Sequence, residues 1–83
     1  MRLEPHVSSA VADYARLYLV VDIANPPVGV DFGEIRDQLL PWADVLSGGN
    51  GYIYVKCPSR KALNRARRAV ADYLERWGLA HNL

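Results

Sequence analysis

The spacing of apolar residues predicts two clear strands. Residues 16–23, RLYLVVDI, are almost continuously apolar and rich in β-branched and aromatic side chains, which is typical of a strand at the centre of a sheet. Residues 52–57, YIYVKC, alternate between two faces, which predicts a second strand. Pro26 and Pro27 follow the first strand and Pro58 ends the second, because proline cannot donate a hydrogen bond to a sheet.

A helical stripe follows the first strand. We expect a helix over residues 31–46, begun by a capping-box-like pair of Asp31 and Glu34. Pro41 predicts a kink near Leu40, or two short helices of which Pro41 starts the second. Residues 47–51 form a loop by composition. The stripe recurs at spacings of four, three and four residues: Ile35, Leu39, Trp42 and Leu46.

The last helix is expected from about residue 60 to residue 77. Ser59 is placed to cap its start. Gly78 allows a left-handed stop, and Leu79 can fold back over the final turn. The positions expected to be buried are Leu63, Ala66, Val70, Leu74 and Trp77.

The N-terminal segment leaves two interpretations open. Residues 4–15 are expected to form a helix, with Pro5 in its first turn. A strand with Val7, Ser9 and Val11 on one side is the alternative. The helix would bury Val7, Ala10, Val11 and Tyr14.

These elements predict one domain over residues 1–83. Its class is α/β or α+β, a small two-layer βαβα-type fold with an extra N-terminal helix or strand. Two strands make a marginal sheet. A third strand from the N-terminal segment, a ferredoxin-like arrangement, and completion of the sheet by dimerisation through a strand edge all stay open.

Composition narrows the setting of this domain. The chain of 83 residues has a single cysteine, Cys57, which excludes an internal disulfide. Cys57, His6 and His81 lie far apart in the sequence, so no metal site is expected, and no cofactor. The first ten residues lack the apolar run of a signal peptide, and residues 17–21 are too few to cross a membrane. We expect a cytoplasmic protein with no membrane partner.

Charge is divided along the chain. Residues 1–58 carry a net charge of −3, whereas residues 59–83 carry +4. An exposed face of basic residues can neutralise phosphates, although a merely solvated face has the same composition. Asp72 lies four residues from both Arg68 and Arg76, where ordinary helix ion pairs form. The basic residues of the predicted last helix are Lys61, Arg65, Arg68 and Arg76 along one line, with Arg60 and Arg67 flanking them.

Tyrosines on the second strand form the other candidate site. Alternation places Tyr52, Tyr54 and Lys56 on one face, where exposed rings could stack single-stranded bases. The alternative is that tyrosine simply suits a half-buried strand face. The choice depends on whether helices cover that face.

Catalytic chemistry is not expected. Cys57 precedes a helix start and lies near Arg60 and Lys61, which would favour a thiolate, but alternation directs it to the core as a structural thiol. Asp22 ends the central strand without an evident partner, so we expect it to cap a loop. No set of nucleophile, base and orienting group can be assembled.

The sequence therefore predicts a small non-enzymatic protein-interaction or regulatory module. It would be of the adaptor or inhibitor type that a phage or mobile element could encode, docking on a larger protein or complex through a charge-segregated surface. An RNA or single-stranded DNA-binding domain is the alternative, using the basic last helix and the strand tyrosines. The net charge of +1 and the acidic first part rank protein binding first.

Overall fold

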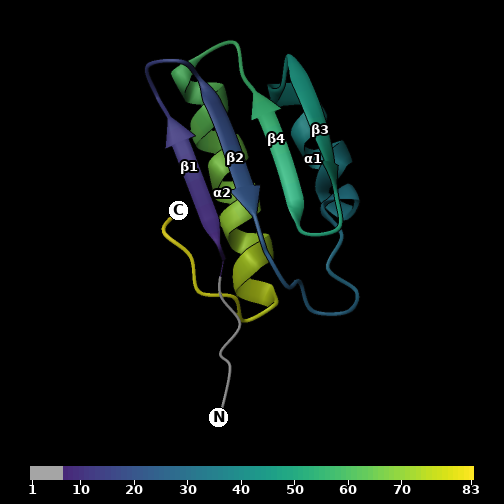
Figure 1. The fold of residues 1–83 in the computed structure, drawn as a ribbon. Coiled ribbons are helices and arrows are strands. Elements are labelled where there is room, and N and C mark those ends of the chain that lie inside the picture. The colour runs from purple at the N-terminus through teal and green to yellow at the C-terminus, as the bar shows by residue number, and fades with distance from the viewer. Residues whose placement is uncertain (1–6) are drawn as a thin grey trace.

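A computed structural model describes residues 7–83, which form two β-hairpins, a run of short helices and one long helix (Figure 1). The first hairpin consists of β1 (Ser9–Asp13) and β2 (Tyr18–Asp22), and the second of β3 (Val45–Gly49) and β4 (Tyr52–Lys56). Between the hairpins lie η1 (Phe32–Ile35), α1 (Arg36–Leu39) and η2 (Leu40–Trp42). The long helix α2 (Arg60–Arg76) follows β4.

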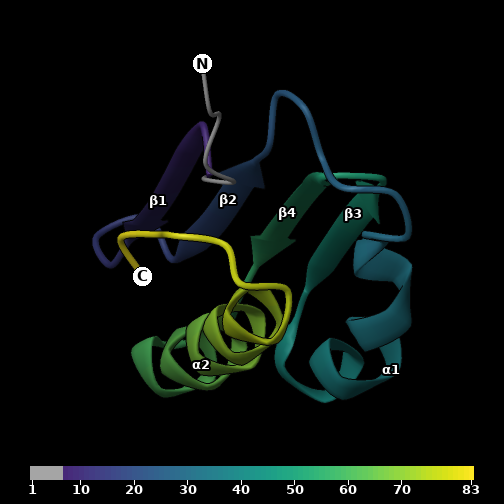
Figure 2. The same cartoon turned by 90° about the horizontal axis from the view of Figure 1, so that it is seen from below.

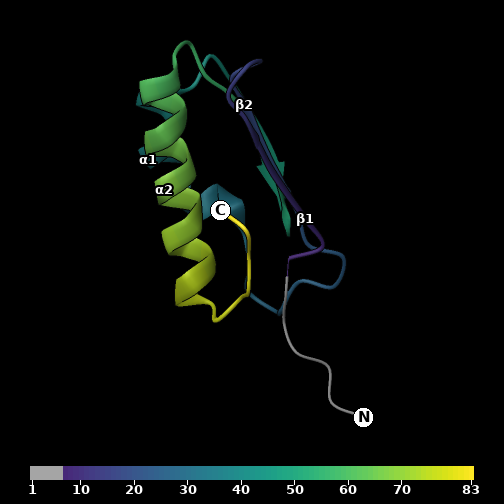
Figure 3. The ribbon, with the colours of Figure 1, turned by 90° about the vertical axis from the view of Figure 1, so that its left-hand side faces the viewer.

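The four strands form one antiparallel sheet in the order β1-β2-β4-β3. β2 and β4 are its central strands, as predicted for residues 16–23, and Leu19 lies opposite Val55 between them. All helices lie on one face of the sheet (Figures 2 and 3), which makes this a small α+β domain of two layers. The ferredoxin-like order βαββαβ ends on a strand after the second helix. This chain has no strand after α2 among its described residues. Its additional edge strand is β1, which comes first in the chain.

The expected N-terminal helix is wrong, and its strand alternative is right for the residues that the structure describes. β1 pairs with β2 along its whole length, so the backbone groups of β1 that face β2 are satisfied by the sheet. Ser9 and Val11 point away from the helices, whereas Ala10 and Ala12 pack against the core. Pro5 and the rest of residues 4–6 lie outside the described part of the chain.

The helix expected over residues 31–46 ends at Trp42. The last short helix, η2, begins at Leu40 with Pro41 in its first turn, so the helical run changes near Leu40 as expected, one residue before the start predicted at Pro41. Residues 45–49, expected as helix and loop, form β3 instead. A Cβ atom on Gly48 would lie 2.9 Å from the backbone oxygen of Tyr52, so glycine lets β3 approach β4 closely. The short run VLSGG offers no alternation from which this strand could be predicted.

The predicted limits of α2 are confirmed. The Ser59 hydroxyl accepts from the backbone N–H of Ala62 at 3.1 Å. Gly78 has a φ of +68°, and the N–H of Leu79 donates to the carbonyl of Leu74 at 2.9 Å. Trp77 is half-buried rather than buried. The other four residues of the predicted stripe are buried beneath the sheet: Leu63, Ala66, Val70 and Leu74.

The buried Tyr73 of α2 makes one of the two hydrogen bonds expected of the capping box. Asp31 caps η1 as predicted, since its carboxylate accepts from the N–H of Gly33 at 2.8 Å. The N–H of Asp31, however, donates to the hydroxyl of Tyr73 at 2.9 Å, not to Glu34. The same hydroxyl lies 3.0 Å from the carbonyl oxygen of Asp31 and 3.2 Å from Oε1 of Glu34. Tyr73 thereby joins α2 to the start of η1.

Candidate binding face

The face of the sheet opposite the helices is uncovered by any helix or strand of residues 7–83 (Figure 3). The alternation of each strand decides which side chains lie there, because Leu19, Val21, Ile53 and Val55 are buried on the helix side. We call the other side the open face. It comprises three residues from each strand: Ser9, Val11, Asp13, Tyr18, Val20, Asp22, Val45, Ser47, Gly49, Tyr52, Tyr54 and Lys56.

Aromatic and β-branched side chains occupy the middle of the open face. The rings of Tyr18 and Tyr54 are stacked, with centroids 6.2 Å apart and planes 22° from parallel. Val20 lies opposite Tyr54 across the β2–β4 pair. Large side chains that are well exposed flank this centre: Val11 at 44%, Val45 at 51% and Tyr52 at 42%. The open face thus has an apolar and aromatic centre, with polar and charged residues among the positions around it.

Two of the three charged residues on the open face bind the chain's own backbone. The carboxylate of Asp13 accepts from the N–H groups of Ala15 and Arg16, each at 2.9 Å. The ammonium of Lys56 donates to the carbonyl of Arg16. Asp22 is exposed, and the loop after β2 is held by the Ser8 hydroxyl, which accepts from the N–H of Ala24 at 2.7 Å. Ser8 therefore has the capping role expected of Asp22.

The predicted basic residues and the predicted tyrosines lie on different layers. α2 packs on the helix side of the sheet, so Lys61, Arg65 and Arg68 are separated by the sheet from Tyr52 and Tyr54 (Figure 2). These two groups cannot contact the same short ligand.

Three of the six basic residues of α2 contact parts of this chain outside α2. The guanidinium of Arg65 lies 4.4 Å from the ring centroid of Trp42, and that of Arg60 lies 5.6 Å from the ring centroid of Tyr14. Nε of Arg67 donates to the Tyr14 hydroxyl at 2.9 Å. Tyr14 was expected in the core of an N-terminal helix, and the sequence did not link it to these arginines.

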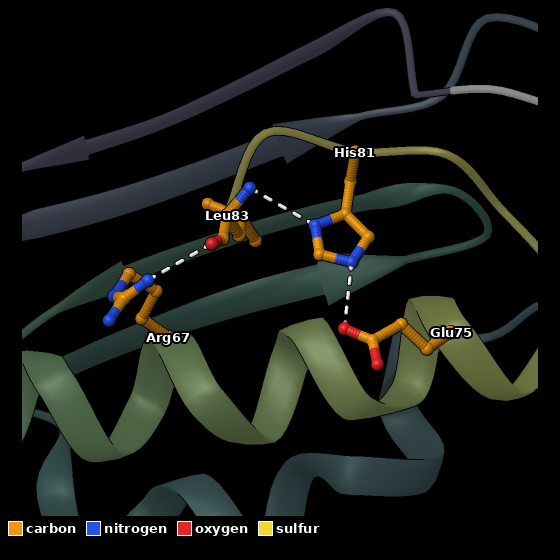
Figure 4. A network of polar contacts seen from close by, with 4 residues as sticks. All are labelled: Arg67, Glu75, His81 and Leu83. Carbon is orange, nitrogen blue, oxygen red and sulfur yellow. Dashed lines mark hydrogen bonds and ion pairs between the residues drawn. The ribbon is translucent and has the colours of Figure 1, made fainter.

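The segment after α2 folds back along the helix and contacts it through polar groups (Figure 4). Nη1 of Arg67 donates to the carbonyl of Leu83 at 3.0 Å, and Nδ1 of His81 accepts from the Leu83 N–H at 3.0 Å. Nε2 of His81 lies 3.1 Å from Oε2 of Glu75, which is the one close contact between a basic and an acidic side chain found in residues 7–83. The expected helix ion pairs of Asp72 are therefore wrong within this range.

Cys57 is a buried free thiol, as predicted from the alternation of β4. Burial raises the pKa of the Cys57 thiol above its ordinary value of 9.0, and the negative charge of Asp44 raises it further. The thiol is therefore held in its protonated form, which is the weaker nucleophile.

Residues 7–83 were also compared with the requirements of a metal site and of a membrane-spanning helix. No group of three His, Cys, Asp or Glu side chains in this range lies close enough to hold a metal ion. No helix in the same range has the length and apolar character needed to cross a membrane. Neither protein-family models, curated proteins nor solved structures match this chain.

Proposed function

We propose that this chain is a cytoplasmic, non-enzymatic protein-binding module of the adaptor or inhibitor type, which docks a larger partner protein on the open face. The observation that carries the proposal is an uncovered sheet face that is rich in tyrosine and valine and poor in free charge. Contiguous apolar surfaces of this kind commonly serve as interaction sites.

The centre of the open face, where Tyr18, Val20 and Tyr54 lie, resembles in composition the core of a protein–protein interface. Such cores are enriched in tyrosine and depleted of lysine and aspartate. Each tyrosine offers an apolar ring and a hydroxyl that can hydrogen-bond across an interface. Tyr18, Tyr52 and Tyr54 provide three such side chains on neighbouring strands. The complementary partner surface is apolar at its centre and carries a basic group opposite Asp22.

The charge-segregated docking surface that the sequence predicts is revised by this geometry. The basic line of α2 lies in the other layer of the domain. Docking on the open face leaves Lys61 and Arg68 exposed to solvent. Their contribution to binding would be a long-range field, which alters association rates more than affinity.

An RNA or single-stranded DNA ligand on the same face is the second candidate. The stacked pair of Tyr18 and Tyr54 on the central strands favours it, because bases stack on aromatic residues displayed on open four-stranded sheets. Charge disfavours it. Lys56 is the only cation of the open face, whereas Asp13 and Asp22 would repel a phosphate backbone.

Affinity capture from a lysate of the native host, with and without nuclease, tests the proposal. The tagged protein is compared with Tyr54→Ser on the open face and with Arg68→Gln on the helix layer as the matched control. We expect the wild-type chain and Arg68→Gln to retain one stoichiometric protein after nuclease treatment, and Tyr54→Ser to lose it. Recovery of RNA or DNA that disappears with nuclease and with rising salt would instead support the second candidate.

A further inference from the structure

The outer edge of β3 is unpaired among residues 7–83. β3 ends the sheet, and β4 is its hydrogen-bonded neighbour. At the other edge the chain extends β1 toward its own last segment, since the N–H of Val7 donates to the carbonyl of Ala80 at 2.9 Å. Exposed edges are usually protected by charged side chains, proline or a bulge. The five residues VLSGG contain neither a charge nor a proline.

The two ends of β3 differ in size. Val45 projects from the open face and is 51% exposed, whereas Gly49 has no atom within 4 Å of the place a Cβ would take. On the helix side Leu46 is half-buried, and Gly48 borders a hollow of about 30 Å³ between β3 and η1. The hollow is lined by Phe32, Gly33, Arg36, Leu46, Gly48 and Ile53. On the open face, β3 therefore has a large side chain at its start and free space at its end.

We infer that two copies of this chain pair through their β3 edges, antiparallel, about a two-fold axis at Ser47. This register places Val45 opposite the partner's Gly49 and Leu46 opposite the partner's Gly48. On the open face, Val45 thus lies beside the space left by the partner's Gly49, and the two-fold axis repeats this contact. Asp44 comes opposite the partner's Asn50, so no like charges meet. Antiparallel pairing of one strand with its own copy is self-complementary, so the assembly closes at two chains.

The register also joins the two open faces. Opposed residues of an antiparallel pair project from the same face. The open-face residues of β3 have odd numbers, so the two open faces lie on the same side when odd-numbered residues pair with odd-numbered residues. A register shifted by one residue would pair odd-numbered with even-numbered residues. The open face of one copy would then lie on the same side as the helices of the other. Pairing centred on Ser47 therefore gives a continuous eight-stranded sheet with one uncovered side.

The size of the open face gives a reason for this assembly, and this step rests on the proposed function. Four strands about 4.8 Å apart and five residues long, at about 3.4 Å per residue, outline on the order of 300 Å². A standard protein–protein interface buries about 800 Å² on each partner. One open face is small for a stable docking site, and two joined faces provide twice the outline.

Sedimentation equilibrium of the full chain between about 5 and 500 μM tests the inference through Ser47, which faces its own copy across the axis. Opposed Cβ atoms in such a pair lie about 4.5–5.5 Å apart, so like charges there repel. We expect the mass to rise from one chain to two, and Ser47→Asp and Ser47→Lys each to weaken dimerisation at least tenfold. A one-to-one mixture of the two variants should recover the dimer, and Ser47→Thr should keep it. Circular dichroism of each variant checks that the fold is retained.

A wild-type mass of one chain at every concentration would overturn the inference, as would either charged variant dimerising as tightly as wild type. So would a mixture that associates no better than its components. The outcome is separable from the proposed function: a dimer without open-face capture contradicts that function alone. A monomer that still captures a protein through Tyr54 contradicts this inference alone.

Discussion

Tyr18 on β2 stacks on Tyr54 of β4, and this pair lies on the side of the sheet that no described helix covers. Because Tyr54 is half-buried, replacing it should cost little folding free energy. We predict that Tyr54→Ser lowers the free energy of unfolding by about 1 kcal/mol, the scale of a cross-strand aromatic pair. Urea denaturation measures this. Ile53→Ala, one residue away on the helix side, is the control and should cost about 2–5 kcal/mol. Equal losses in the two variants would place Tyr54 in the core.

Gly29 is required by its backbone conformation and by a close neighbour. Its φ is +99°, and a Cβ atom there would lie 2.9 Å from Cη2 of Trp77. We predict that Gly29→Ala lowers the free energy of unfolding by about 1–3 kcal/mol. Gly49→Ala is the control, because nothing lies within 4 Å of its Cβ position, and its effect should stay within about 0.5 kcal/mol. A neutral Gly29→Ala variant would show that the loop adjusts without strain.

Arg65 and Arg68 lie on the same exposed line of α2 but differ in contacts. The Arg65 guanidinium sits 4.4 Å from the Trp42 ring centroid. We predict that Arg65→Gln lowers the free energy of unfolding by about 0.5–1 kcal/mol through loss of this cation–π contact. Arg68→Gln, which removes the same charge, should change it by less than about 0.5 kcal/mol. Chemical denaturation of both variants at the same salt concentration measures the two free energies of unfolding. Equal values for Arg65→Gln and Arg68→Gln would show that the contact with Trp42 does not stabilise the fold.

The buried thiol of Cys57 makes stability depend on alkaline pH. Its folded pKa is raised by burial, then by Asp44, so the folded state holds this proton more tightly than the unfolded chain does. The stabilisation is therefore complete below the ordinary pKa of 9.0 and is lost as pH rises toward the higher folded pKa. We predict that the free energy of unfolding, compared with that of Cys57→Ala, falls as pH rises from 9.0 toward the higher folded pKa. Urea titrations of both proteins at several pH values measure the difference, and a constant difference would contradict the prediction.

Strong local patterns predicted the central half of this fold. β2, β4 and α2 combine periodic apolar residues with clear end signals such as Ser59 and Gly78. β1 and β3 were missed as first expectations because edge strands bury little. The inner residues Ala10 and Ala12 of β1 suit a helix equally well. Gly48 in β3 is typical of a loop until β4 lies beside it. Pairing with a neighbour, not local preference, decides both strands.

The candidate site was predicted in part for the same reason. Alternation placed Tyr52, Tyr54 and Lys56 on one face, but which face the helices cover is decided by packing across the whole sheet. Tyr18 could have been added from its own strand, because Leu19 and Val21 alternate with it. The contacts of the α2 arginines with Trp42, Tyr14 and the last segment join residues distant in sequence, and no local signal announces them.

Hydroxyl-radical footprinting of the captured complex, read residue by residue with mass spectrometry, tests the role of the open face most directly. Free and partner-bound chains are labelled under the same conditions and compared at exposed side chains of both layers. We predict that Tyr52, Tyr54 and Val45 lose labelling in the complex, while Trp42 on the helix layer is labelled equally in both states. Protection of Trp42 with unchanged labelling of Tyr52 and Tyr54 would contradict the account and move the docking surface to the helices.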